Sequence, residues 1–273
     1  MKKTFITLFA MACSAFGAEL VVDLKLDGNF NDSQGNLTIA NSESMTWTNN
    51  SPVLGSDKYV GVSDGNAAWN GTFKTVDGVS TAPSTTDFAI SLFINASAFP
   101  VGNNSEHPAW TCQWIFGGGA VSVGLPKVGI GSDGQIKVSC HNIGGGINSG
   151  ADNVITLNEW YHIGVSLTSA GTVDNEAKSV WTLFINGKSV ASNEVDTPTG
   201  ITWSQISLFE GKDATDSGRY KGLVDDIQIY NVTDLTDAKA VMSAQAARLV
   251  PEPTTATLSL LALAGLAARR RRK

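Results

Sequence analysis

The central part of this sequence almost lacks helical periodicity. Between residues 18 and 248, apolar residues fall in short alternating stretches separated by turns rich in Gly, Asn, Ser and Thr. This pattern is typical of a β-sandwich or a β-barrel. The segment has no internal repeat and no Pro-rich linker before Val250. It therefore predicts one all-β domain, with a helix expected only over residues 234–248.

The sequence also has few residues that could carry catalysis. Its 3 histidines are His107, His141 and His162, and they stand in no order with Ser, Cys or Asp that indicates nucleophilic catalysis. Strand alternation places His162 on the wetter side of its strand. The nearest carboxylate motif, residues 194–200, lacks the second Glu of sandwich glycosidases and contains Pro198, so we interpret it as a loop. We predict that the protein is not an enzyme.

Positive charge is scarce between the two ends of the chain. The whole chain has a net charge of −6 and its two ends together carry a net charge of +6, which leaves the central domain at −12. Phosphate backbones repel such a domain, so we exclude nucleic acid as a partner.

Cysteine is nearly absent as well. After the N-terminal segment only Cys112 and Cys140 occur, each beside apolar residues in a predicted strand. Export permits oxidation, so a disulfide between Cys112 and Cys140 is one prediction. Two buried free thiols are the alternative.

Residues 1–17 have the three parts of a secretory signal. Two lysines precede an apolar stretch over residues 5–13, and Ala15 and Gly17 occupy the −3 and −1 positions of a cut before Ala18. About nine apolar residues are too few to span a membrane, which needs roughly 20. A lipoprotein cut at the cysteine of this segment is the alternative.

Residues 249–273 carry a second membrane signal. Pro251, Glu252 and Pro253 precede a mostly apolar run over residues 256–268, and five basic residues end the chain. A short apolar helix with such a cluster should halt in a membrane, with the cluster in the cytoplasm. The two prolines keep the preceding segment extended. This order resembles the PEP-CTERM sorting signal of Gram-negative bacteria.

That resemblance implies an exosortase-type enzyme that recognises the Pro-Glu-Pro segment and removes the tail. It predicts a protein held transiently in the inner membrane by its tail, then placed in the cell envelope or extracellular matrix. An ordinary C-terminal anchor is the alternative.

Five motifs of the central domain resemble laminin-G-like, concanavalin A-like domains. They read LDGNFNDSQGN, FAISLFINA, EWYHIGV, FINGK and GLVDDIQIYN, at residues 26–36, 88–96, 159–165, 184–188 and 222–231. The resemblance implies a two-sheet antiparallel jelly-roll sandwich over residues 18–248. A short C-terminal helix would close it, and the sorting helix would lie apart in the tail.

The resemblance leaves the function open, because such domains bind sugars, bind proteins or hydrolyse polysaccharides. Sugar modules stack exposed aromatic residues on sugar rings, and Trp47, Trp69 and Trp203 stand near polar, turn-like sequence. We predict these three as ligand-binding residues of a glycan- or matrix-binding module, and assign Trp160 and Trp181 to the core. The alternative is that Trp47, Trp69 and Trp203 each pack at the edge of the core and bind no ligand. The alternative function is a structural envelope or matrix protein without a specific ligand, and a third is a polysaccharide hydrolase.

A structural calcium ion is predicted where the first and last strands meet. In the strand over residues 223–230, alternation places Asp225 on the apolar side with Ile227 and Ile229, where a carboxylate is costly without a cation or donors. The resemblance implies the same, since many such sandwiches bind calcium there. The predicted ligands are Asp225, Asp23, Asp27 and Asp32, with carbonyl oxygens of the loop at 28–36. The alternative is that Asp225 accepts backbone N–H bonds and no metal is present.

Overall fold

The computed structural model describes residues 17–40, 45–62, 69–100, 112–117, 126–140, 146–203, 206–209 and 220–249, without the side chains at 40, 62, 69 and 140. The predicted secretory signal (apart from Gly17) and the predicted sorting tail (apart from Leu249) lie outside these residues. His107 and His141 lie outside them too. No helix in the part of the chain that is described has the length and apolar character needed to cross a membrane.

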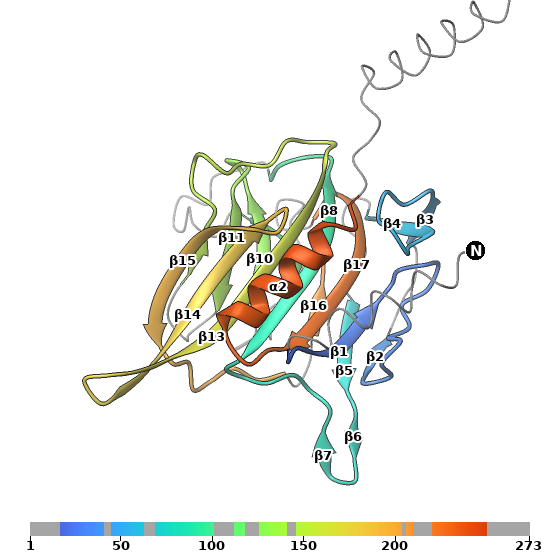
Figure 1. The fold of residues 1–273 in the computed structure, drawn as a ribbon. Helices are drawn as coiled ribbons and strands as arrows, with labels where there is room; N and C mark the ends of the chain where they lie inside the picture. The colour runs from blue at the N-terminus through green and yellow to red at the C-terminus, as the bar shows by residue number, and fades with distance from the viewer. Residues whose placement is uncertain are drawn as a thin grey trace, which may run out of the picture.

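Two antiparallel sheets form a sandwich (Figure 1). The first sheet runs in the order β15 (Lys188–Asp196), β14 (Glu176–Ile185), β13 (Trp160–Val173), β8 (Phe88–Ala96), β17 (Gly222–Asn231), β4 (Lys58–Val62) and β3 (Thr46–Asn49), and β1 (Glu19–Leu24) also pairs with β17. The second runs in the order β12 (Ile147–Asn148), β11 (Ile136–Cys140), β10 (Pro126–Gly131), β9 (Cys112–Phe116), β16 (Ile206–Leu208), β5 (Trp69–Phe73) and β2 (Leu37–Ala40). A separate hairpin of β6 (Thr75–Val76) and β7 (Val79–Ser80) projects from one end. The all-β sandwich prediction is confirmed.

Alternation along the strands builds the core between the sheets. On β8, Ile90, Leu92 and Ile94 point inward and are fully buried, and on β13 the same holds for Ile163 and Val165. Strand residues two apart share a face, so these positions form one continuous apolar surface.

Helix α2 (Leu235–Ala246) covers the other face of the first sheet, where it lies over β13 and β8 (Figure 1). Its N-cap is Asp234, whose carboxylate accepts the N–H groups of Thr236 and Asp237. Val241 and Met242 pack against sheet residues in a second apolar cluster. The predicted helix is therefore confirmed.

This helix corrects the wetter environment expected for His162. The ring does point away from the main core, but it is fully buried beneath α2, where its Nε2 lies 3.0 Å from the Ser91 hydroxyl. Burial disfavours the charged ring, and with the nearby Arg248 charge it lowers the pKa of His162 to about 3. Strand alternation gave the correct face, whereas only the packing of α2 decided that this face is dry.

Gly164 lets α2 approach the sheet closely. A Cβ atom there would lie 2.2 Å from Met242 Sδ and 3.2 Å from Phe184 Cβ. We expect Gly164→Ala to lower the free energy of unfolding by about 1–3 kcal/mol, because the buried Met242 side chain must shift and its packing between α2 and the sheet is disturbed. Urea unfolding measures this, with Gly61→Ala as the control, since its new methyl would have no neighbour nearer than 3.4 Å. Equal losses in the two variants would contradict the close approach.

A bulge in β17 changes the predicted faces of its residues. The pairing with β8 shifts register between Asp225 and Gln228, and Asp226 has a positive φ of 44°. The bulge shifts the alternation by one residue. Val224, Ile227 and Ile229 consequently share the core, and Asp225 leaves the apolar side on which alternation had placed it.

Two further predictions need correction. Cys112 pairs with Gly131 and Cys140 with Pro126, at opposite ends of β10, which lies between their two strands. Two strand spacings of about 4.8 Å already exceed the limit of about 7 Å for a disulfide, so this register does not allow the predicted bond. Glu194 and Asp196 belong to edge strand β15, and only the residues from Thr197 onward leave it as a loop.

Candidate functional site

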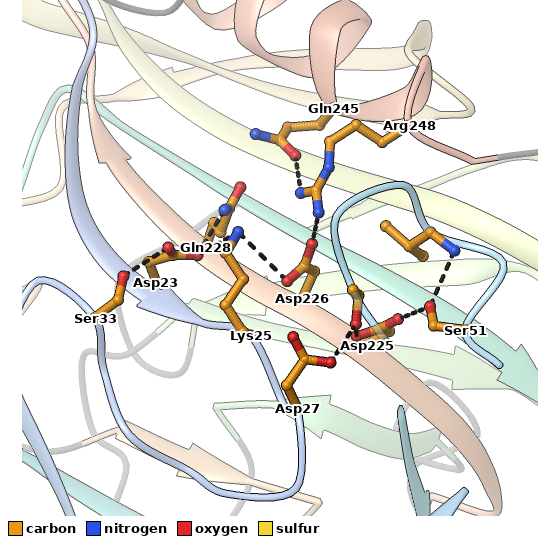
Figure 2. Close-up of polar contacts among 12 residues, drawn as sticks. Asp23, Lys25, Asp27, Ser33, Ser51, Asp225, Asp226, Gln228, Gln245 and Arg248 are labelled. Carbon is orange, nitrogen blue, oxygen red and sulfur yellow. Dashed lines mark hydrogen bonds and ion pairs between the residues drawn. The ribbon is translucent and has the colours of Figure 1, made fainter. Parts of the chain in front are cut away.

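The first and last strands of the domain meet in a buried polar network (Figure 2). Asp23 on β1 accepts hydrogen bonds from Gln228 (2.7 Å) and Ser33 (2.7 Å). Lys25 Nζ lies 3.0 Å from Asp23 and 3.6 Å from Asp226. Burial raises the pKa of Asp23, but the Lys25 charge and these hydrogen bonds outweigh it and hold the pKa below its usual value.

Arg248 joins the end of α2 to this network. Its guanidinium forms an ion pair with Asp226, and the two side chains are 6% and 0% exposed. It also donates to the Gln245 side chain (2.8 Å) and to the Leu54 carbonyl (3.0 Å). Burial raises the pKa of Asp226, and the charges of Arg248 and Lys25 lower it. The effect of burial is larger, so the pKa lies above its ordinary value. The ion pair thus anchors the end of the helix on the bulge of β17.

Asp225 has different partners. Its carboxyl group accepts hydrogen bonds from the hydroxyl groups of Ser51 and Ser56. The Ser56 hydroxyl also lies 3.0 Å from a carboxylate oxygen of Asp27. Asp27 further accepts the N–H groups of Asp57 and Lys58. Burial and the neighbouring Asp226 charge raise the pKa of Asp225 to about 8. Hydroxyl groups therefore serve as the hydrogen-bond donors to this buried carboxyl group. Backbone N–H groups were the sequence-based alternative to calcium, and the hydroxyl groups take that role instead.

The four predicted calcium ligands do not form one ligand set. Asp32 accepts four backbone N–H groups, from Asp23, Gln34, Asn36 and Leu37, which shapes its own loop. The Asp23 carboxylate is paired with Lys25, and the carboxyl groups of Asp27 and Asp225 share the Ser56 hydroxyl. Within the described ranges, no group of three or more acidic, His or Cys side chains could hold a metal ion. The residues present do not fit the predicted calcium.

Thermal unfolding tests calcium binding directly. From these contacts we expect the same midpoint of thermal unfolding in calcium and in a chelator. A ligand that binds only the native state raises its stability, so a higher midpoint with calcium would show that other ligands hold an ion.

The three tryptophans predicted to bind a ligand differ in their surroundings. Trp203 is 4% exposed, donates its ring N–H to the Ser84 carbonyl and packs on Phe88, so it belongs to the core. Trp47 is half-buried with its ring 5.0 Å from that of Phe30. The side chain of Trp69 lies outside the described part, so its role stays a prediction.

The outward face of the second sheet is polar. Neighbouring residues in β10, β11 and β16 point into the core, so Lys127, Lys137 and Ser207 point away from it. Ser207 donates to the Asn70 side chain (2.9 Å), and Lys127 Nζ lies 5.8 Å from the centre of the Trp114 ring. Trp114 belongs to neither apolar cluster, but it is buried, as are Lys127 and Ser207. Sequence reasoning missed this face, although strand alternation could have found it.

The assignment of Trp160 to the core was wrong. Trp160, predicted as core, is only half-buried, and its ring lies 5.3 Å from that of Tyr59 in an edge-to-face arrangement. Trp181, predicted with it, is fully buried as expected.

The two antiparallel sheets and the helix that covers one of them define a sandwich of the jelly-roll class. The family described as the concanavalin A-like lectin/glucanases superfamily (Laminin_G_3) matches residues 70–239. This match spans more than half of the chain, and the protein belongs to this family. No curated protein matches the sequence.

Solved structures share the fold at low sequence identity. Domain 4 of AbnA, a GH43 extracellular arabinanase from Geobacillus stearothermophilus solved with arabinotriose, aligns with a TM-score of 0.52 and 15% identity, over 83% of this chain and 99% of that one. The botulinum neurotoxin type G receptor binding domain aligns with a TM-score of 0.55 and 14% identity, over 83% and 51%. The botulinum neurotoxin serotype D ligand binding domain, solved with N-acetylneuraminic acid, gives 0.55 and 12%, over 86% and 53%. This chain thus spans about half of each toxin domain.

Proposed function

We propose that this protein is an exported, non-catalytic module that binds a glycan or the extracellular matrix. The observation that carries the proposal is the polar outward face of the second sheet. There the amide of Asn70 and the ammonium group of Lys137 are partly exposed, whereas Ser207, which donates to Asn70, and the Trp114 ring are buried. The hydroxyl groups of a sugar can form hydrogen bonds with such amide and ammonium groups. The sugars bound in two of the similar structures support this ligand class.

Two arrangements argue against catalysis. His162 and Ser91 contact each other, but both are fully buried beneath α2, where no polymer could reach them. Glu194 and Asp196 lie on exposed edge strand β15, and Asp196 is ion-paired with Lys178. A glycosidase needs two carboxyl groups that face one substrate with different protonation.

Export and sorting complete the proposal and rest on the two sequence signals at the ends of the chain. An exosortase-type enzyme would act on the Pro251–Pro253 segment, which follows closely after Leu249, the last residue described. Mass spectrometry of the mature protein should find no peptides from residues 1–17 or 258–273. A stable full-length form in the cell envelope would contradict this part.

A glycan array with the purified protein tests the binding function. We expect binding to at least one polysaccharide, weakened in the variants Asn70→Ala or Lys137→Ala and without release of reducing sugar. Release that a single carboxylate substitution abolishes would show an enzyme. No binding on the array or to immobilised matrix polysaccharides would favour the structural envelope protein instead.

A further inference from the structure

One part of the first sheet remains uncovered by the helix. α2 ends at Ala246, and Arg248 lies over the Phe93 ring at 5.7 Å. The next residue of β8 on that face is Asn95, which is half-buried. Beyond Arg248, the sheet therefore presents its own side chains to solvent.

The strand register aligns these side chains in a row across five strands. Trp160 lies opposite Asn95, Asn95 opposite Leu223, Leu223 opposite Gly61, and Gly61 opposite Thr46. Directly opposite residues share a face, and the neighbours Tyr161, Ile94, Val224 and Val60 all pack in or against the main core. The row therefore points outward, and Thr46 at its end is exposed.

Tyr59 completes the surface, because it is two residues from Gly61 on β4 and so shares the face. Its ring meets that of Trp160 at 5.3 Å and an angle of 72°, although their strands are separated by β17 and β8. The two rings reach toward each other across the sheet. Both are half-buried and so keep part of their surface in water.

We infer that Trp160, Tyr59, Asn95 and Thr46 form a stacking site for neighbouring sugar residues of a neutral polysaccharide, because the row is four strand spacings of about 4.8 Å long. A sugar ring has an apolar C–H face that fits an aromatic ring, and its hydroxyl groups fit an amide and a hydroxyl beside it. The row and Tyr59 contain no charged side chain, which favours a neutral sugar over an acidic one. This inference rests on the proposed glycan binding, but it places a site on the sheet opposite to the polar face described above.

Binding of neutral polysaccharides to the purified protein and its variants tests the site. We expect Trp160→Ala to weaken binding about tenfold, the loss of one aromatic contact. Because Trp160→Ala can also disturb the fold, Thr46→Arg is the second variant: it blocks the site from an exposed position. Thr172→Arg, at an exposed position toward the other end of β13, is the control, and thermal unfolding is measured for all of them.

The outcomes separate the two proposals. Weaker binding by both Trp160→Ala and Thr46→Arg, with Thr172→Arg unchanged, supports the stacking site. Normal binding by Thr46→Arg and Trp160→Ala, with loss in Asn70→Ala, overturns this site and leaves glycan binding intact on the other face. Failure of the wild-type protein to bind any polysaccharide overturns both.

Discussion

Arg248→Met is expected to lower the free energy of unfolding by about 3–5 kcal/mol. The substitution leaves the carboxyl group of Asp226, which is 0% exposed, without its main counter-ion. Lys25 cannot replace it, because Lys25 lies 3.6 Å away and is itself 36% exposed. Since domains are stable by only about 5–15 kcal/mol, this one change should remove a large part of the stability. Urea unfolding at neutral pH measures it.

A second substitution tests the cause of this loss. Asp226→Asn in the Arg248→Met background removes the unpaired charge, and asparagine tolerates the positive φ of 44° at this position. We expect the double variant to regain much of the stability, because removing both charges of a buried pair costs far less than removing one. Lys178→Met, which breaks an exposed ion pair on β14, should change little. A double variant no more stable than Arg248→Met would show that the arginine acts through its other hydrogen bonds.

The second large effect is a loss of stability as the pH rises toward 8. The pKa of Asp225 is about 8 in the folded protein against an ordinary value of 3.8. Between these values the folded protein keeps a proton that the unfolded chain has released, so unfolding becomes more favourable with rising pH. The stabilisation is complete below about pH 4 and is lost as the pH passes through about 8. One such group contributes a slope of up to about 1.4 kcal/mol per pH unit.

Asp225→Asn isolates this contribution. The amide cannot ionise, and it can still exchange hydrogen bonds with Ser51 and Ser56. We expect the variant to have a flatter stability profile between pH 5 and 8 in the presence of a chelator, and to be more stable than the wild type at pH 8. Asp32→Asn is the control, since its carboxyl lies in an exposed loop and accepts backbone N–H groups. Parallel profiles of Asp225→Asn and wild type would contradict a buried, protonated Asp225.

Several features of the fold could be predicted from local sequence. The alternating apolar residues of β8 and β13 and the Asp234 cap of α2 each depend on neighbours within a few residues. The motifs from residue 26 to residue 231 indicated the sandwich, and the family match over 70–239 agrees with them.

The candidate sites depended on contacts between distant segments. Alternation placed His162 on the correct face, but it could not show that α2 covers that face. The same reasoning failed at Asp225, because the single residue Asp226 with positive φ shifts the alternation of the whole strand. Trp160 was assigned to the core because it begins a strand, yet helix α2 stops short of it.

Sequence alone determined which segments form strands, where the one described helix begins and which family motifs the chain carries. These properties follow from backbone periodicity, turn residues and capping, which act over short distances. Tertiary structure alone decided which carboxyl groups form ion pairs with lysine or arginine and which accept hydrogen bonds from hydroxyl groups. It also decided which aromatic rings stay in water. The partners in these contacts, such as Asp226 with Arg248 and Tyr59 with Trp160, come from distant parts of the sequence and meet only when the sheets and α2 have packed.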